Sequence, residues 1–341
     1  MEPPTYADVL AARPRVYAHL TPSPLLHHPL LDEWVGCRVL VKHENHNPTG
    51  SFKIRGGLNL VGQLDDRERQ RGVIAASTGN HGQSLALACQ LHSVRCRIVV
   101  PVGANPDKMA AIRAFGAEVM EQGRDFDEAR EWVEDFAARE GWRYVHNANE
   151  PHLISGVATY AAEVFEAVDR VDFVFVPIGG GSGAAGCAVV REGLGTKTRI
   201  VGVQAHEADA FTRSWRGPER VTSERAATFA EGIATRTTFD LTFSMLKAAL
   251  DDVVTLEEEE LREGVTAAIQ YTHNLAEGAG AAPLAAARQF KPPRSATVVC
   301  VMSGGNADMR TLPPPLAEIA RELRRDSLKR LGREGGRHTL A

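Results

Sequence analysis

Continuous apolar segments that alternate with helix-like stretches constrain the fold of this chain more than any other feature. Six segments are predicted to be buried strands: residues 38–42, 72–76, 97–101, 172–176, 199–203 and 296–301. Helix-like stretches lie between some of them, at about residues 83–90, 106–115 and 126–139. Strands that are apolar throughout and are connected by helices form parallel sheets covered on both faces. The sequence therefore predicts an α/β protein built of βαβ units.

Length, charge and cysteine content narrow the class of protein. A chain of 341 residues suggests about two domains or one large α/β unit. The net charge of −4 gives no electrostatic case for a nucleic-acid partner. No apolar run approaches the length of about 18 residues that a membrane span needs. The start has no secretory pattern, and the five cysteines show no paired metal spacing, so we expect a cytoplasmic location with reduced thiols.

One lysine lies in a segment where a solubilising lysine has little reason to lie. Residues 47–57 read Asn-Pro-Thr-Gly-Ser-Phe-Lys-Ile-Arg-Gly-Gly, and we expect Pro48, Gly50, Gly56 and Gly57 to shape the backbone on both sides of Lys53. Apolar surroundings disfavour an ammonium ion, and the amine then becomes a nucleophile and a base. A carbonyl is the natural partner of such an amine, and pyridoxal phosphate is the obvious biological candidate.

Three glycine-bearing turns each follow a predicted strand. They occupy residues 76–82 (Ala-Ser-Thr-Gly-Asn-His-Gly), 177–186 (Pro-Ile-Gly-Gly-Gly-Ser-Gly-Ala-Ala-Gly) and 301–306 (Val-Met-Ser-Gly-Gly-Asn). Ligands of open α/β sheets bind at the carboxyl ends of strands. We therefore expect the three turns and the Lys53 segment to converge on one site.

The second turn is typical of a phosphate cradle. Its glycines let backbone N–H groups surround an anion, and the following helix adds the positive end of its dipole. A rival interpretation is dinucleotide binding, because Gly181, Gly183 and Gly186 satisfy G-x-G-x-x-G. That pattern also needs an acidic residue at the end of the next strand, where this chain has Gln204, and Glu207 follows past the expected place.

The first and third turns carry hydroxyl and amide groups. Ser77, Thr78 and Asn80 could bind a substrate carboxylate at a helix start, although all three are also good helix caps. In the third turn, Ser303 could face a pyridine nitrogen. A neutral hydroxyl does not keep that nitrogen protonated, so the ring is a weaker electron sink. This favours elimination of a β leaving group as the Cα proton is lost.

The four motifs, in this order, resemble those of the tryptophan-synthase-like pyridoxal-phosphate enzymes (fold type II). Within that group the chain is most similar to the serine/threonine dehydratases and serine racemases, over about residues 20–323. Residues 51–56 (Ser-Phe-Lys-Ile-Arg-Gly) match the dehydratase form of the lysine motif. Threonine synthases usually carry Asp after the lysine, and cysteine synthases usually carry Val before it.

The resemblance implies a role for each matching position. Lys53 forms the Schiff base with the cofactor and then acts as the base at Cα, and Phe52 packs against the cofactor ring. Asn80 hydrogen-bonds the ring hydroxyl oxygen, and Ser303 faces the pyridine nitrogen. The phosphate is held by Gly179, Gly180, Gly181, Ser182 and Gly183. The loop that holds the substrate carboxylate contains Ser77, Thr78 and His81. Glu277 matches a glutamate near the cofactor, or is simply a carboxylate at a helix N-terminus.

Three positions depart from the family pattern. Ser182 replaces the fourth glycine of the phosphate loop, and its hydroxyl can also donate to phosphate. Racemases carry a serine on the far face of the cofactor where this chain has Thr78. As a catalytic residue Thr78 keeps the hydroxyl but adds a methyl group, which puts racemisation in doubt. The stretch that binds a divalent cation in many members here has Gln204 and Ala210 at the expected acidic positions. Glu207 and Asp209 could substitute as oxygen ligands, but we expect no metal site.

The resemblance also implies the organisation of the chain. A large cofactor-binding domain would contain residues 1–70 and 150–323, and a small mobile domain residues 71–149. Residues 324–341 would form a basic tail. Family members are commonly homodimers. With no room for a regulatory domain, we expect no feedback by isoleucine.

The sequence thus predicts a pyridoxal-phosphate lyase that acts on a β-hydroxy-α-amino acid such as L-threonine or L-serine. Competing activities are a specialised dehydratase for hydroxyaspartate, phenylserine or a hydroxyectoine-derived amino acid, and a serine racemase. A cofactor-binding protein without turnover and an NAD oxidoreductase also stay open as interpretations. The side-chain pocket is expected from about residues 146–155 and 230–239, where Glu231 replaces the Asp usual in dehydratases and indicates a non-standard pocket.

Overall fold

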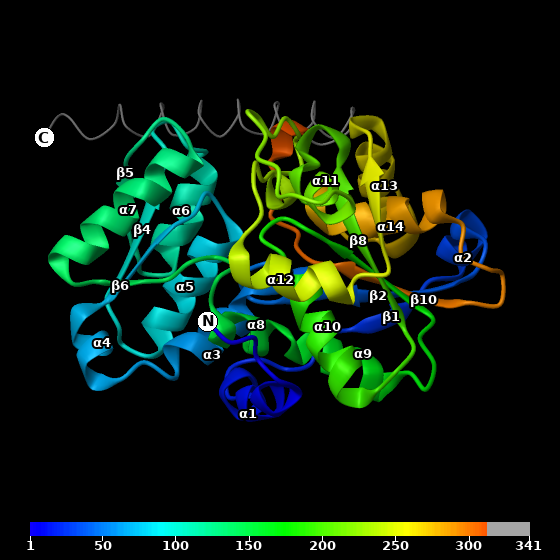
Figure 1. Cartoon of the computed structure of the whole chain (residues 1–341), viewed down its shortest axis with the longest axis horizontal. Helices are drawn as coiled ribbons and strands as arrows, with labels where there is room; N and C mark the ends of the chain where they lie inside the picture. Colours follow the sequence, from blue (N-terminus) through cyan, green and yellow to red (C-terminus); the bar gives the residue numbers. More distant parts are fainter. Residues whose placement is uncertain (312–341) are drawn as a thin grey trace, which may run out of the picture.

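The structure is a computed structural model that describes residues 1–311. Two sheets with their surrounding helices lie side by side (Figure 1). Strands within residues 73–144 form the smaller sheet, and strands from both sides of that segment form the larger one. The predicted α/β class with parallel sheets is therefore confirmed. The predicted basic tail, residues 324–341, lies outside the described residues.

The larger sheet has six strands in the order β1-β2-β10-β7-β8-β9. Their bounds are β1 (Leu25–His27), β2 (Arg38–His43), β7 (Phe173–Pro177), β8 (Arg199–Ala205), β9 (Asp252–Leu256) and β10 (Thr297–Met302). β1 is antiparallel to β2, and the other neighbouring pairs are parallel. β10 therefore joins β2 to β7 near the middle of the sheet.

The smaller sheet has four parallel strands in the order β5-β4-β3-β6. Their bounds are β3 (Val73–Ala76), β4 (Cys96–Val100), β5 (Glu118–Glu121) and β6 (Arg143–Tyr144). β3 and β4 are the apolar centre of this sheet, and β5 and β6 are its edges.

Helices connect and cover the strands. Those in the first half of the described chain are α1 (Tyr6–Tyr17), α2 (Pro29–Val35), η1 (Glu44–His46), α3 (Lys53–Val61), α4 (Asp66–Arg71), α5 (Asn80–Leu91), α6 (Pro106–Ala114), α7 (Phe126–Glu140), α8 (Pro151–Val157) and α9 (Thr159–Ala167). Those in the second half are α10 (Ser182–Leu194), η2 (His206–Ala208), α11 (Ala210–Arg216), η3 (Glu231–Ile233), α12 (Asp240–Ala249), α13 (Glu258–Thr272), α14 (Gly278–Phe290) and η4 (Met309–Thr311).

Both faces of each sheet are buried, which explains the continuous apolar runs. In β2, Val39 and Val41 pack toward α2, α13 and α14, whereas Leu40 between them packs toward α8, α9 and α10. In the smaller sheet, Val73 and Ala75 face α3, α5 and α6, and the alternate residues face α7. Successive side chains of a strand point to opposite faces, so a strand covered on both sides needs no polar alternation.

The six predicted strands are all present, and four further strands were missed. The missed strands β1 and β6 have three and two residues, too few to give a pattern. β5 begins and ends with exposed glutamates, so it shows no apolar run. β9 contains only a short apolar stretch and lies at the sheet edge.

Gly56 and Gly57, which were expected to shape the backbone after Lys53, do so inside a helix. Lys53 is the first residue of α3, and Gly56 and Gly57 lie within that helix. A Cβ atom at Gly56 would lie 2.8 Å from the Leu153 carbonyl oxygen, and one at Gly57 would lie 2.5 Å from the Ser84 hydroxyl oxygen. These glycines therefore serve close packing of α3 against α8 and α5.

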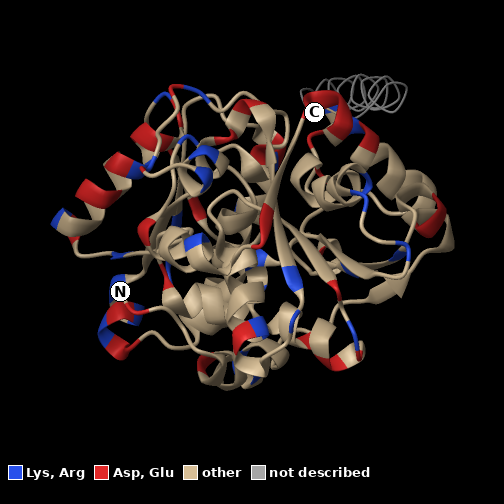
Figure 2. Ribbon diagram, turned by 45° about the vertical axis from the view of Figure 1, so that its right-hand side comes forward, with Lys and Arg blue, Asp and Glu red and all other residues tan. Residues whose placement is uncertain are grey.

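Positions with basic and with acidic residues alternate along the outer helices of the ribbon (Figure 2). Within residues 1–311, no helix is both long and apolar enough to cross a membrane. All five cysteines are buried free thiols.

Candidate active site

One cavity of about 520 Å³ lies at the carboxyl ends of β3, β4, β5, β7 and β10. Its volume is within the range of about 300–1,000 Å³ that is usual for small-molecule sites. All thirteen residues that the sequence singled out for the site line this cavity. They are Phe52, Lys53, Ser77, Thr78, Asn80, His81, Gly179, Gly180, Gly181, Ser182, Gly183, Glu277 and Ser303. Both sheets thus contribute the ends of their strands to the same space.

Lys53 enters the cavity from the N-terminus of α3. Its Nζ atom donates a hydrogen bond to the Ser182 Oγ atom over 2.8 Å and lies 4.9 Å from the centre of the Phe52 ring. Burial lowers the pKa of the Lys53 ammonium to about 8, since the charged form has lost its water. A substantial fraction of this amine is therefore neutral near pH 8, as a nucleophile or base requires.

The glycine-rich turn joins β7 to the N-terminus of α10. Gly181 has a φ of +87°, a conformation that side chains rarely adopt. A Cβ atom at Gly179 would lie 2.2 Å from the Gly232 carbonyl oxygen, so the turn must approach η3 as bare backbone. The turn precedes a helix of 13 residues, whose N-terminal N–H groups and dipole favour an anion.

The rival dinucleotide interpretation lacks its acidic partner. Gly186, its third glycine, packs against Ala158, where a Cβ would lie 2.9 Å from the Ala158 Cα. At the end of β8, Gln204 is fully buried, and its Oε1 atom accepts hydrogen bonds from the N–H and hydroxyl of Thr212. No carboxylate occupies the ribose-binding position at Gln204.

Asn80 and Glu277 on the cavity wall form a hydrogen-bonded chain with Asn306, which lies outside the cavity lining. The Asn80 Nδ2 atom donates to Glu277 Oε1 over 2.7 Å, and Asn306 Nδ2 donates to Asn80 Oδ1 over 2.7 Å. Burial raises the pKa of the Glu277 carboxyl, and the Asn80 hydrogen bond opposes this effect. The chain fixes the Asn80 amide, which keeps a second N–H on Nδ2 for a ligand. Sequence reasoning did not identify Asn306 as a partner.

The turn after β3 is held by its own serine. Ser77 Oγ accepts hydrogen bonds from the N–H groups of Gly79 (3.2 Å) and Gly82 (2.8 Å). The N-cap residue of α5 is Gly79, so none of the polar residues Ser77, Thr78 and Asn80 is the N-cap. The Ser77 side chain nevertheless satisfies the Gly82 N–H in the first turn of the helix. Thr78 lies half-buried at the cavity wall.

His81 has a buried ring nitrogen without a partner. Its Nε2 lies 3.4 Å from the Val145 carbonyl oxygen, whereas its Nδ1 makes no hydrogen bond. Burial, with a smaller effect of Lys53, lowers the pKa of the His81 imidazole to about 3. The ring is therefore neutral at physiological pH, and Nδ1 can accept a hydrogen bond from a ligand.

Polar contacts join the two sheet units at and beside the cavity, and sequence reasoning missed them. Lys108 on α6 forms an ion pair with Glu231 on η3, and both residues line the cavity. Arg236 Nε donates to Asp127 Oδ2 over 2.6 Å. Lys108 follows the predicted strand at residues 97–101, and the rule that ligands bind after strand ends would have drawn attention to this segment.

Both segments expected to form the side-chain pocket contribute to the cavity. Asn147 comes from the first, and Glu231, Gly232, Ala234 and Thr235 come from the second. The Thr235 hydroxyl oxygen is buried and has no partner. The pocket therefore offers an ion pair and a hydroxyl to a substrate side chain.

The stretch compared with a cation site in the family is occupied by internal pairs. Asp209 Oδ1 accepts from Arg213 Nε over 2.8 Å, and His206 Nδ1 lies 3.4 Å from Glu207 Oε1. Within residues 1–311 no group of three or more histidines, cysteines or acidic residues has a metal-binding arrangement.

The cavity fits pyridoxal phosphate by its chemistry. The turn at residues 179–183 offers backbone N–H groups to a phosphate, and Lys53 offers a partly neutral amine to a carbonyl. Asn80 and Ser303 offer hydrogen-bonding groups to the polar edge of a pyridine ring, and Phe52 offers an apolar face. The unpartnered Nδ1 of His81 indicates that a polar ligand completes this wall.

Comparison with known proteins agrees with this geometry. Residues 16–304 match the family described as "Pyridoxal-phosphate dependent enzyme". The chain is 35% identical to the L-threonine ammonia-lyase of Thermotoga maritima over 90% of this chain and 77% of that protein. It is 32% identical to the L-threo-3-hydroxyaspartate ammonia-lyase of Saccharomyces cerevisiae over 90% and 94% of the two chains. The structure of maize serine racemase superposes with a TM-score of 0.88 at 25% identity, covering 96% of this chain and 100% of the maize chain. The chain therefore belongs to the family of pyridoxal-phosphate dependent enzymes, as its motifs indicated.

Proposed function

We propose that this chain is an ammonia-lyase that converts a β-hydroxy-α-amino acid, such as L-threonine or L-serine, into a 2-oxo acid and ammonia. The observation that carries the proposal is the Lys53 amine, with a pKa near 8, in a cavity walled by an anion-binding turn and a helix N-terminus. The Thermotoga relative, named for this reaction on L-threonine, supports the substrate class.

Binding of the reactants is assigned to groups around the cavity. The turn of Gly179, Gly180, Gly181, Ser182 and Gly183 would hold the cofactor phosphate, with Lys53 bonded to the cofactor carbon. Asn80 and Ser303 would orient the ring, and Glu277 would hold the Asn80 amide in place. The backbone N–H groups at the start of α5, next to Ser77 and Thr78, would bind the substrate carboxylate.

The chemical step needs a base at Cα. When bound, pyridoxal phosphate supplies an electron sink for the charge that develops at Cα. Once the substrate amine has displaced it from the cofactor carbon, the free Lys53 amine would take the Cα proton, because its low pKa leaves it neutral near pH 8. The β-hydroxyl leaves as water, and hydrolysis of the released product gives the 2-oxo acid and ammonia. The Ser303 hydroxyl, which does not hold a proton on the pyridine nitrogen, suits elimination better than racemisation.

A second candidate is a dehydratase for hydroxyaspartate. The Lys108 side chain lines the cavity and is only 13% exposed to solvent. An anionic substrate side chain in the cavity would compete with Glu231 for its charge. The Saccharomyces relative is named for this substrate. Phenylserine and a hydroxyectoine-derived amino acid stay candidate substrates, whereas the methyl group of Thr78 argues against serine racemisation.

Release of 2-oxo acid by the purified, cofactor-loaded protein tests the proposal. The panel contains both enantiomers of serine and threonine, with hydroxyaspartate and phenylserine. We expect rapid release from L-threonine or L-serine. Activity on hydroxyaspartate alone would move the function to the second candidate. Cofactor binding without product from any amino acid would refute the lyase assignment.

We also propose that residues 71–149 form a small domain that moves over bound substrate, and that the protein is a cytoplasmic homodimer. The polar contacts between the two sheet units support a closing domain. The five free cysteines support a reducing compartment. The dimer rests on the family resemblance alone. Sedimentation velocity with and without substrate tests both the mass and the closure.

A further inference from the structure

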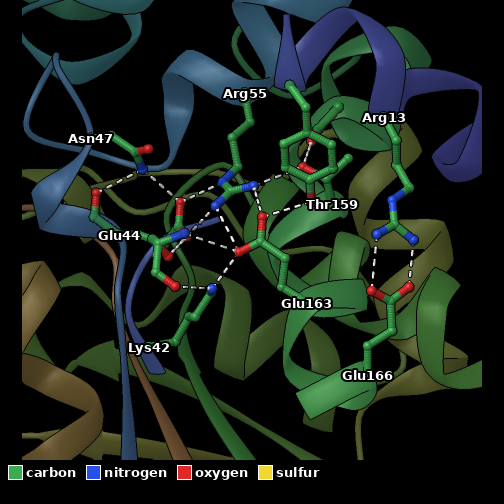
Figure 3. Close-up of polar contacts among 11 residues, drawn as sticks. Arg13, Lys42, Glu44, Asn47, Arg55, Thr159, Glu163 and Glu166 are labelled. Carbon is green, nitrogen blue, oxygen red and sulfur yellow. Dashed lines mark hydrogen bonds and ion pairs between the residues drawn. The ribbon is translucent and has the colours of Figure 1, made fainter. Parts of the chain in front are cut away.

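The Glu44 carboxylate binds residues on both sides of Lys53. Asn47, six residues before the lysine, donates from Nδ2 to Glu44 Oε2 over 2.8 Å and to the Glu44 carbonyl oxygen over 2.9 Å. Arg55, two residues after it, donates from Nε to Oε2 over 2.7 Å and from Nη2 to Oε1 over 2.9 Å. Figure 3 shows Asn47 and Arg55 converging on Glu44. One side chain thus fixes the chain before the lysine and the helix after it.

Glu44 belongs to a fully buried ionic network. Glu44 and Arg55 are 0% exposed, and Lys42 is 1% exposed. Arg55 Nη1 also donates to Glu163 Oε1 over 2.6 Å, and Lys42 forms an ion pair with the same glutamate. Two cations and two anions balance within the network. Because buried ionic groups stay in place only when paired, Glu44 has little freedom to move.

Lys53 and Arg55 point in different directions from α3. Residues two apart on a helix do not share a face, so Arg55 reaches the buried network while Lys53 reaches the cavity. The backbone around Lys53 is also held from the cavity side. Phe52 N–H donates to the Ser303 carbonyl oxygen over 3.0 Å, and Ser84 Oγ donates to the Lys53 carbonyl oxygen over 2.6 Å. The base of the lysine side chain is therefore fixed at several points.

We propose that Glu44 is a positioning residue for Lys53, which it holds in reach of the cofactor and substrate through Asn47 and Arg55. The inference rests on the role proposed for Lys53. Glu44 lies in the buried network and outside the set of residues that line the cavity, so it acts through the backbone. A displacement of about 1 Å in a reacting group can cost about 10²-fold in rate. Loosening this clamp should therefore slow the chemistry without weakening substrate binding.

The Asn47→Ala variant is the sharpest test, because it cuts the clamp and leaves all four charges of the network paired. Glu44→Gln weakens both arms. The matched controls are Glu163→Gln, which disturbs the charges of the network, and Thr159→Val. Thr159 accepts a 3.1 Å hydrogen bond from Arg55 but does not contact Asn47. Each holoenzyme is measured for kcat, KM and thermal midpoint, so that loss of stability is recorded separately.

A readout independent of turnover follows the lysine itself. Apoprotein is mixed with pyridoxal phosphate, reduced with borohydride at set times, and the labelled peptide is identified by mass spectrometry. We expect Asn47→Ala to lower kcat by about tenfold or more and to slow labelling of Lys53, with KM within about threefold of the wild type. Glu163→Gln and Thr159→Val should lower the thermal midpoint but keep the labelling rate within about threefold.

Three results are decisive. Wild-type kcat and labelling rate in both Asn47→Ala and Glu44→Gln would overturn the positioning role of Glu44. Equal losses of labelling in Asn47→Ala and Thr159→Val, at equal thermal midpoints, would reduce Glu44 to a general stabilising role and also overturn the inference. Labelling of the wild type at a lysine other than Lys53 would refute the proposed function, and the inference with it.

Discussion

The Lys53 amine lies 2.8 Å from the Ser182 hydroxyl oxygen, so the lysine reaches directly to the turn that begins α10. Lys53 and the glycine turn at residues 179–183 thus border the same cavity. In the function proposed above, a phosphate held by this turn would compete for the Ser182 hydroxyl and would leave the Lys53 amine free to react with a carbonyl. Lys53 therefore lies next to the turn that we propose binds the phosphate.

Replacement of Lys53 should remove both a base and the covalent attachment point. Proton transfer by a positioned group contributes about 10²–10⁴-fold, so Lys53→Ala should lower kcat by at least this factor. Oxo-acid release measures the loss, and an unchanged thermal midpoint shows that the variant is folded. Retention of more than a tenth of the wild-type kcat would contradict the assignment.

Attachment of pyridoxal phosphate to the apoprotein should depend on pH through the Lys53 amine. Only the neutral amine attacks, and its pKa is about 8 compared with an ordinary value of 10.5. The attachment rate should therefore rise with increasing pH and level off above about pH 8. Stopped-flow absorbance at a series of pH values checks this. A rate that continues to rise tenfold per pH unit up to pH 10 would show an unperturbed lysine.

Gly179→Ala should disrupt the glycine turn. The added Cβ would lie 2.2 Å from the Gly232 carbonyl oxygen, so the turn or η3 must shift. We expect the Kd for pyridoxal phosphate, measured by equilibrium dialysis, to rise at least about tenfold, which corresponds to about 1.4 kcal/mol. Gly183→Ala is the comparison, because its Cβ would meet Phe52 at an ordinary 3.6 Å. Equal affinities in the two variants would contradict the steric argument.

Glu231→Gln should change substrate preference. Removing this carboxylate frees the charge of Lys108 for an anionic substrate side chain. A half-exposed ion pair is worth about 1 kcal/mol at most, so the ratio of kcat/KM for hydroxyaspartate to that for L-threonine should rise by up to about fivefold. The control is Asp127→Asn, which removes another ion pair between the two sheet units. Asp127 does not line the cavity, so this variant should leave the ratio unchanged. A fall in the ratio for Glu231→Gln would contradict the prediction.

Arg55→Met should destabilise the fold strongly. It leaves Glu44 and Glu163 buried without their guanidinium, and breaking such a pair costs about 3–5 kcal/mol. Denaturant unfolding measures the change in the free energy of unfolding. The control is Arg13→Met, since Arg13 pairs with Glu166 at the surface and its loss should cost about 1 kcal/mol or less. Similar losses in the two variants would mean that the network contributes little.

The cavity could be predicted from the sequence because its signals are local. The turns that contain Ser77, Ser182 and Ser303 each combine a strand end with glycines, and parallel topology brings strand ends together. Glu44 and Asn47 gave no such signal. Their proposed role depends on Arg55, which in turn pairs with Glu163, 108 residues farther along the chain. In a sequence, a buried charge cannot be told from a surface charge until its partner is placed.

The same limit applies to Lys108 and Glu231. Lys108 lies on a helix of ordinary composition, and its partner comes from the other sheet unit. The sequence does not show why Gly56 and Gly57 are glycines, because the contacts that require them come from α8 and α5. Local patterns locate the strands and their turns, whereas the packing of one unit against another depends on pairs that no local pattern contains.

The place of β10 sets the order in which the enzyme can be assembled on the ribosome. Among the strands that the structure describes, β10 is made last but joins β2 to β7, so until it emerges the larger sheet consists of two separate pieces. Lys53 follows the β2 piece, and the glycine turn follows the β7 piece. A nascent chain that stops before residue 297 therefore has no route to a complete cofactor site, and capture of the cofactor must follow the synthesis of nearly the whole described chain.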